Sequence, residues 1–107
     1  MEQMVLGELV EGILSILESQ VIRIVLYGSV ARGTNTAESD VDIALLLNGN
    51  LSRETEDKLS DLIVDLNLKY DIVLSVIDID YEMFKWEKVT PFYKNVNEEG
   101  VVLWKAA

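Results

Sequence analysis

Four residues in one short stretch, GSVARGTNTAESDVD, have types and spacing that suit phosphoryl chemistry. Gly28 and Ser29 open the stretch, and after ten further residues it closes on Asp40 and Asp42 with one residue between them. Because side chains alternate between the faces of a strand, the two aspartates should project from the same side, roughly 7 Å apart along it. Two carboxylates that close repel each other unless positive charge lies between them. We therefore expect a cation site here.

Magnesium fits this pair of carboxylates, because it prefers oxygen ligands and commonly binds one or two carboxylates together with phosphate oxygens. Two magnesium ions about 3.5–4 Å apart form a clamp that stabilises the attacking and leaving oxygens of a phosphoryl displacement. The sequence does not decide between magnesium and manganese. It does favour a nucleoside triphosphate beside the two ions.

Gly28 and Ser29 suit the phosphates of such a ligand. A glycine that ends a buried strand lets the backbone approach phosphate, and N–H groups at the start of a helical turn bind anions. Ser29 adds a hydroxyl, and Arg32 is either a further phosphate ligand or an ordinary surface arginine. The segment is not a P-loop, because Thr34 stands where that motif has lysine. The structural alternative is a plain turn followed by solvated aspartates.

A third carboxylate is expected from the neighbouring strand, and Asp71 is the candidate. It begins the apolar run DIVLSVI as Asp40 begins its own strand, so adjacent pairing would bring both to one edge of the sheet. Asp71 would bind the second metal ion or act as the base for an acceptor hydroxyl; otherwise it caps a turn. Asp78 and Asp80 are expected in a loop, as capping or solvated residues.

The composition limits the chemistry further. The chain has 107 residues, half of them hydrophobic, so residues 1–107 are expected to form a single folded domain. It contains no cysteine and no histidine, which excludes disulfides, thiolate metal sites and histidine bases. The formal charge of −10 argues against direct binding to nucleic acid and favours a basic protein partner or a metal-neutralised ligand. The N-terminus is acidic and no apolar run reaches membrane-spanning length, so we expect a cytoplasmic location and no membrane contact.

Helical and β-rich segments alternate along the chain, which predicts an α/β layered domain with one small sheet flanked by helices. The apolar spacing predicts a helix over residues 5–17, and Ser52 is expected as the N-cap of a second that ends near Lys69. The other expected elements are strands over residues 21–27, 40–47 and 71–77, a short helix over 80–87, a helix from Thr90-Pro91 to near Gly100, and a terminal edge strand over 101–104.

With these residues in view, the chain resembles the minimal nucleotidyltransferase family of the DNA polymerase beta superfamily. The resemblance rests on Gly28-Ser29, on Ala31-Arg32-Gly33, and on Ser39-Asp40 with Asp42, which together match the family's GS-x10-D-x-D signature. The order of elements and the ending NEEGVVLW are also similar, so the resemblance spans nearly the whole chain. It implies the palm-like nucleotidyltransferase fold of that superfamily, with a small mixed sheet.

The resemblance also implies transfer of a nucleoside monophosphate from a triphosphate such as ATP to an acceptor hydroxyl. Asp40 and Asp42 would bind the two metal ions, Gly28 and Ser29 the phosphates, and Asp71 would complete the triad; Tyr27 would belong to the core. A chain this short has no room for an acceptor domain, so another chain should present the acceptor. Stand-alone proteins of this kind resemble the antitoxin of HEPN/MNT toxin–antitoxin pairs, which adenylylates a tyrosine of the HEPN ribonuclease toxin.

Two other functions stay open at this point. One is a non-catalytic antitoxin that inhibits a partner by covering it, and the other is a nucleotidyltransferase for a small molecule. The aromatic residues of the second half build either the core or an interface of a homodimer or toxin complex, and the core is the commoner use: Trp86, Phe92, Tyr93 and Trp104.

Overall fold

The computed structural model describes residues 2–28, 40–82, 96, 98 and 100–106. Its elements, in chain order, are helix α1 (Glu2–Leu17), the short 3-10 helix η1 (Glu18–Gln20), strands β1 (Val21–Tyr27) and β2 (Val41–Leu47), helix α3 (Arg53–Tyr70), and strands β3 (Leu74–Asp80) and β4 (Val101–Lys105). None of the described helices is both long enough and apolar enough to cross a membrane.

Within the described residues, four strands form one mixed sheet in the order β3-β2-β1-β4. β1 pairs antiparallel with β2 on one side and with β4 on the other, whereas β2 and β3 run parallel. A parallel pair needs a crossover connection, and α3 supplies it between β2 and β3. The predicted fold class, a small mixed sheet with helices, is confirmed.

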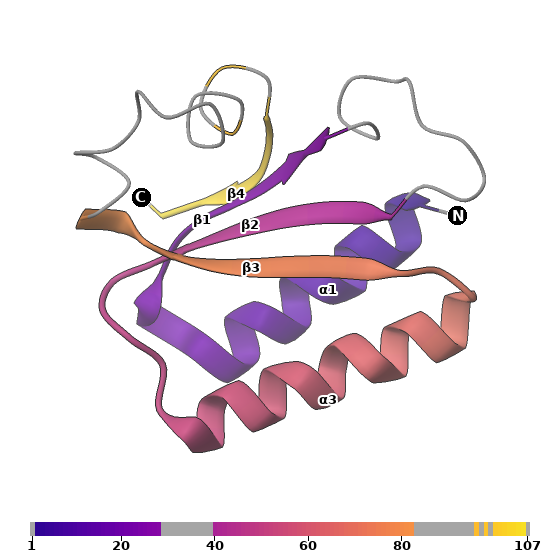
Figure 1. Ribbon diagram of the computed structural model, residues 1–107, viewed down its shortest axis with the longest axis horizontal. Coiled ribbons are helices and arrows are strands. Elements are labelled where there is room, and N and C mark those ends of the chain that lie inside the picture. The colour runs from indigo at the N-terminus through magenta and orange to yellow at the C-terminus, as the bar shows by residue number, and fades with distance from the viewer. Residues whose placement is uncertain (1, 29–39, 83–95, 97, 99, 107) are drawn as a thin grey trace.

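Helices α1 and α3 lie on the same side of the sheet (Figure 1). The inward face of α1 is formed by four apolar residues spaced four apart, Val5, Leu9, Ile13 and Leu17, all of which are buried. They share one core cluster with Leu59 and Leu66 of α3 and with alternate residues of the strands. These contacts fix which side chains of each strand face the helices.

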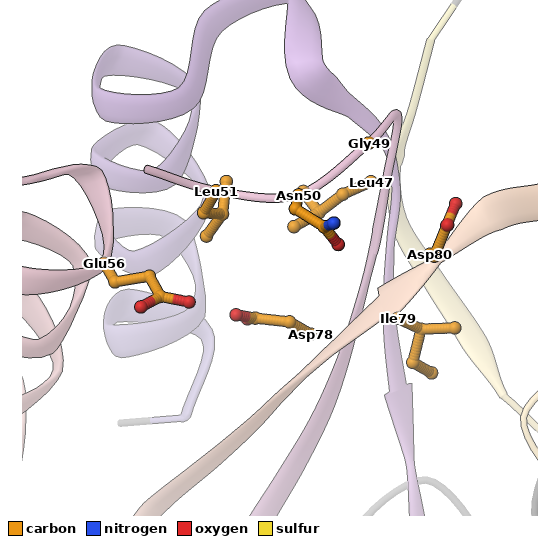
Figure 2. Close-up of a pocket in the computed structure, with 8 residues that line it drawn as sticks. All are labelled: Leu47, Gly49, Asn50, Leu51, Glu56, Asp78, Ile79 and Asp80. Atoms are coloured by element: carbon orange, nitrogen blue, oxygen red, sulfur yellow. The ribbon is translucent and has the colours of Figure 1, made fainter. Parts of the chain in front are cut away.

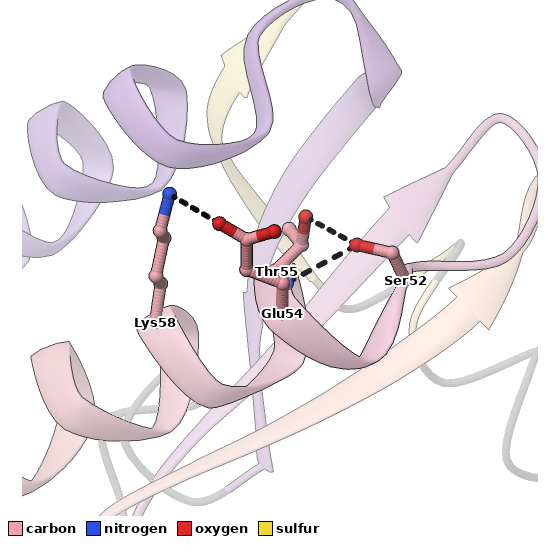
Figure 3. Close-up of polar contacts among 4 residues, drawn as sticks. All are labelled: Ser52, Glu54, Thr55 and Lys58. Atoms are coloured by element: carbon pink, nitrogen blue, oxygen red, sulfur yellow. Dashed lines mark hydrogen bonds and ion pairs between the residues drawn. The ribbon is translucent and has the colours of Figure 1, made fainter.

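Helix α3 begins where its N-cap was expected (Figure 3). The Ser52 hydroxyl accepts a hydrogen bond from the Thr55 backbone N–H at 3.2 Å and lies 2.8 Å from the Thr55 hydroxyl. One turn further, Lys58 Nζ lies 3.5 Å from Glu54 Oε1, in an exposed ion pair. The cap satisfies a backbone donor that would otherwise have no partner in the first turn.

A second, smaller cluster lies on the opposite face of the sheet. It contains Val25 of β1, Ala44 and Leu46 of β2, Ile79 of β3, and Val96. Tyr27 packs against this cluster, as expected for a core residue. We call the side that carries this cluster the open face, because neither described helix covers it.

Several sequence predictions need correction or fall outside the described residues. β3 begins at Leu74 rather than Asp71 and continues to Asp80, so Asp78 and Asp80 lie in a strand and not in a loop. The predicted edge strand is confirmed as β4, and α1 begins at Glu2 rather than at residue 5. Most of the two helices predicted after β3 lies outside the described residues, as do Trp86, Phe92 and Tyr93.

Candidate active site

The end of β1 and the start of β2 lie side by side and bring Gly28 against Asp42. Tyr27, the last residue of β1, is the register partner of Asp42. Gly28 follows with a positive φ of 78°, which glycine adopts readily and other residues rarely do. A Cβ placed on Gly28 would collide with the Asp42 carboxylate oxygen Oδ2. The glycine is therefore required both by the backbone and by the space that the carboxylate occupies.

Asp42 projects onto the open face of the sheet. Its neighbours in β2, Val41 and Ile43, belong to the core cluster beneath the helices, and side chains alternate along a strand. Ala44 and Leu46, which share the side of Asp42, belong to the cluster of the open face. Asp40 has the same parity and is exposed one residue before β2 begins. The pair therefore lies at one end of the sheet, on the side away from α1 and α3.

Tyr27 borders this carboxylate from the neighbouring strand. Burial raises the pKa of the Tyr27 hydroxyl, and the negative charge of Asp42 raises it further. The phenol is consequently neutral at physiological pH and keeps its proton beside the carboxylate.

Asp71 lies in the turn between α3 and β3. It is the C-cap residue of α3 in a left-handed conformation, with φ 52°, and its backbone N–H donates to the Asn67 carbonyl. The Asn67 side-chain oxygen in turn accepts from the Leu74 N–H at 2.9 Å, which fixes the start of β3. Since β2 and β3 are parallel and Val41 pairs with Leu74, Asp71 comes just before the strand at the same end of the sheet as Asp40.

The residue directly opposite Asp42 on β3 is Ser75. Ser75 was not among the expected site residues, because the apolar run predicted a strand that starts at Asp71 and a carboxylate at that edge of the sheet. Ser29 and Arg32, the other expected phosphate ligands, lie outside the described residues.

The carboxylates present fit a hard divalent cation. Asp40 and Asp42 offer oxygen donors of the kind that magnesium and manganese bind, and the glycine at position 28 leaves the space that the Asp42 carboxylate occupies. Across the part of the chain that the structure describes, no three acidic side chains gather into a metal-binding group.

A family model described as "Nucleotidyltransferase domain" matches residues 8–103. The chain belongs to this nucleotidyltransferase domain family.

Two relatives from Methanocaldococcus jannaschii match the nucleotidyltransferase domain over almost its full length. Both are named "Putative protein adenylyltransferase". One is 37% identical over 103 residues, covering 96% of this chain and 98% of its own. The other is 32% identical over 97 residues, covering 91% of this chain and 93% of its own.

Two solved structures share the fold of this nucleotidyltransferase domain at 21% identity. A crystal structure of a toxin-antitoxin with AMP-PNP has a TM-score of 0.63 and covers 94% of this chain and 73% of that chain. A complex of tri-AMPylated Shewanella oneidensis HEPN toxin with MNT antitoxin has a TM-score of 0.62, with 99% and 74% covered. The likeness to both is one of fold.

A second acidic site in this nucleotidyltransferase domain lies at the other end of β3. A cavity of about 200 Å³ is lined by Glu56 of α3, by Asp78 and Asp80 of β3, and by residues of the turn after β2. Figure 2 shows Asp78 extending toward Glu56, whereas Asp80 points away from it. Burial raises the pKa of the Asp78 carboxyl, and the charge of Glu56 raises it further. Asp80 Oδ1 instead accepts a hydrogen bond from the Glu82 N–H at 3.1 Å, as a turn-capping residue.

Proposed function

We propose that this chain is a metal-dependent protein adenylyltransferase that transfers AMP from ATP to a tyrosine hydroxyl of a HEPN ribonuclease toxin. The observation that carries the proposal is the close approach of Gly28 to the Asp42 carboxylate, which places a backbone without a side chain beside an acidic strand end. The names of the two relatives support protein adenylyl transfer. The AMP-PNP and AMPylated-toxin complexes that share the fold support the nucleotide and the kind of partner.

In this reaction the tyrosine oxygen attacks the α-phosphorus of ATP, the bond from that phosphorus to the bridging oxygen breaks, and pyrophosphate leaves. Bound divalent ions would neutralise the charge that develops on the attacking and leaving oxygens. Asp40 and Asp42 would hold those ions, and Gly28 and Ser29 would orient the triphosphate. Because a tyrosine hydroxyl has a pKa near 10, a carboxylate or a metal ion must promote its deprotonation. We assign to Asp71 either the acceptance of this proton or the binding of a further metal ion.

The charge of the chain supports a protein partner. A formal net charge of −10 favours association with a basic surface, which an RNA-cutting protein would offer. We propose that the two proteins form a hetero-oligomer in the cytoplasm, where ATP is available.

Isothermal titration with ATP, in the presence and absence of magnesium, tests the nucleotide site. Wild type should bind ATP in a magnesium-dependent manner, and the Asp40→Asn/Asp42→Asn variant should lose that binding while keeping its circular dichroism spectrum. If folded wild type does not bind ATP, a non-catalytic antitoxin becomes the better explanation. Transfer itself is tested by mass spectrometry of a HEPN toxin incubated with the enzyme and ATP, where an added AMP on tyrosine is expected.

Asp71→Asn tests separately whether Asp71 is the third carboxylate of the site. Asparagine also tolerates the left-handed conformation, so the helix cap should survive the change. If Asp71 is a ligand or base, transfer falls by about a hundredfold or more. Activity within about twofold of wild type would remove Asp71 from the mechanism.

A further inference from the structure

Ser75 of β3 and Tyr27 of β1 flank Asp42 from the two neighbouring strands. The register pairs Asp42 with Tyr27 on one side and with Ser75 on the other. Residues paired across adjacent strands project from the same face, and the strands lie about 4.8 Å apart. Asp42 therefore lies in a row between Tyr27 and Ser75 on one face of the sheet.

The burial pattern of β3 places Ser75 on the open face. Leu74 and Val76, its two neighbours, pack into the core cluster beneath the helices together with Val41 and Ile43 of β2. Alternation then turns Ser75 to the other side, where Asp42 projects, and it is only half-buried there. Ser75 therefore lies on the same face of the sheet as Asp42 and not within the helix-covered core.

We infer that Ser75 is a positioning residue of the nucleotidyltransferase site, whose hydroxyl donates to the Asp42 carboxylate and holds it toward the bound divalent ion. The inference rests on the proposed function and deepens it. It assigns a role to Ser75, a neutral hydrogen-bond donor, at the position opposite Asp42 on the neighbouring strand β3. A carboxylate at that position would add a third negative charge beside Asp40 and Asp42. A hydroxyl instead stabilises the charge of Asp42 and limits its rotation.

The test measures Mn²⁺ binding by electron paramagnetic resonance in the presence of α,β-methylene-ATP, which cannot release pyrophosphate. Ser75→Ala should weaken Mn²⁺ binding about tenfold, as expected for loss of a hydrogen bond to a charged group. Ser75→Thr keeps the hydroxyl and suits a strand, so it should bind within about threefold of wild type. Ser60→Ala, which removes an exposed serine from α3, is the matched control and should bind like wild type.

Asp42→Asn separates the two proposals in the same experiment. If Asp42→Asn loses Mn²⁺ but Ser75→Ala binds it like wild type, the role of Ser75 is wrong and the metal site stands. If Ser75→Ala and Ser75→Thr weaken Mn²⁺ binding equally, the effect comes from packing and the inference also fails. If wild type and Asp42→Asn bind Mn²⁺ equally, the proposed metal site fails, and the role of Ser75 fails with it. Equal thermal midpoints of wild type and Ser75→Ala would show that the loss is local to the site.

Discussion

The chain contains the pattern Asp-x-Asp twice, and the two copies have different surroundings. Asp40 and Asp42 stand at the start of β2, on the open face, with the backbone of Gly28 against one carboxylate. Asp78 and Asp80 stand at the end of β3, where Asp78 faces Glu56 of α3 (Figure 2). The spacing is the same, but the Gly28 backbone lies against a carboxylate of the first pair, whereas Asp78 of the second pair faces the carboxylate of Glu56.

The same spacing of two aspartates therefore occurs in two different surroundings, and we propose a nucleotide site only at the first pair. The proposed nucleotide site also needs a backbone that phosphate can approach beside the carboxylates, and Gly28 is the residue that we propose for this at the first pair. At the second pair, burial and the charge of Glu56 disfavour the ionised form of Asp78, and its pKa is raised. The following experiments test that contrast.

The largest expected effect comes from removing each pair in turn. Asp40→Asn/Asp42→Asn should lower adenylyl transfer about a hundredfold or more, because the ligands of the metal ions are lost. Asp78→Asn/Asp80→Asn should leave transfer within about twofold of wild type. Initial rates of AMP incorporation measure both. Equal losses in the two variants would contradict the contrast.

Replacing two glycines isolates the contact between Gly28 and Asp42. Gly28 and Gly49 both have positive φ, 78° and 84°, so alanine is strained at either position. Gly49→Ala should reduce the free energy of unfolding by about 1–2 kcal/mol, which is the cost of the positive φ alone. Apart from its chain neighbours, no described heavy atom lies within 4 Å of the new Cβ, so no collision adds to this cost. Gly28→Ala should cost about 1–3 kcal/mol more, because Asp42 must move. Urea denaturation measures the difference, and equal losses would show that Asp42 is not crowded.

Asp78→Asn should stabilise the fold slightly at neutral pH. The pKa of Asp78 is raised in the folded state, so its ionised form opposes folding above that pKa, and the penalty disappears below the ordinary value of 3.8. The variant should gain at most about 1 kcal/mol at pH 7, a limit set by partial exposure, and the gain should vanish at lower pH. Thermal unfolding across the acid range checks this, and a destabilised variant at pH 7 would contradict it.

The smallest expected effect on stability comes from an ion pair between helices α1 and α3. Lys69 Nζ of α3 lies 2.7 Å from Glu8 Oε1 of α1, and hydrogen bonds from Lys69 and then Tyr70 lower the pKa of Glu8. A lowered pKa means that this pair stabilises the fold above the ordinary value of 4.5 and that the contribution is lost as pH falls through the lowered pKa.

Glu8→Gln should therefore lower the thermal midpoint at pH 7 but not in strong acid, and it should leave nucleotide binding unchanged. Glu54→Gln, which breaks the exposed pair with Lys58, is the matched control and should change the midpoint less. A pH-independent difference between wild type and Glu8→Gln would refute the role of the Glu8 pair.

Local sequence signals predicted the elements that depend on local chemistry. The β-branched run of β1 gave its bounds, and the Ser52 cap gave the start of α3. The start of β3 was misplaced because Asp71 and the two residues after it belong to the turn that ends α3, a choice made by backbone conformation and the Asn67 hydrogen bonds. Asp78 and Asp80 looked like loop residues, yet an edge strand tolerates charged side chains.

The features of the candidate site also differ in whether the local sequence predicts them. The parity of Asp40 and Asp42 was predictable from alternation along one strand. The row of Tyr27, Asp42 and Ser75 depends on the register between three strands, which the sequence does not specify locally.

The central position of β1 and β2 has a consequence for local opening. Each of these strands is hydrogen-bonded on both sides, whereas β3 and β4 are each paired with one described neighbour. The backbone amides of β1 and β2 should therefore exchange with solvent deuterium only through openings close to global unfolding. The amides of β4 should exchange through smaller openings. Since Tyr27 and Asp42 lie on these two strands, fraying of an edge strand leaves the geometry of the acidic strand end intact.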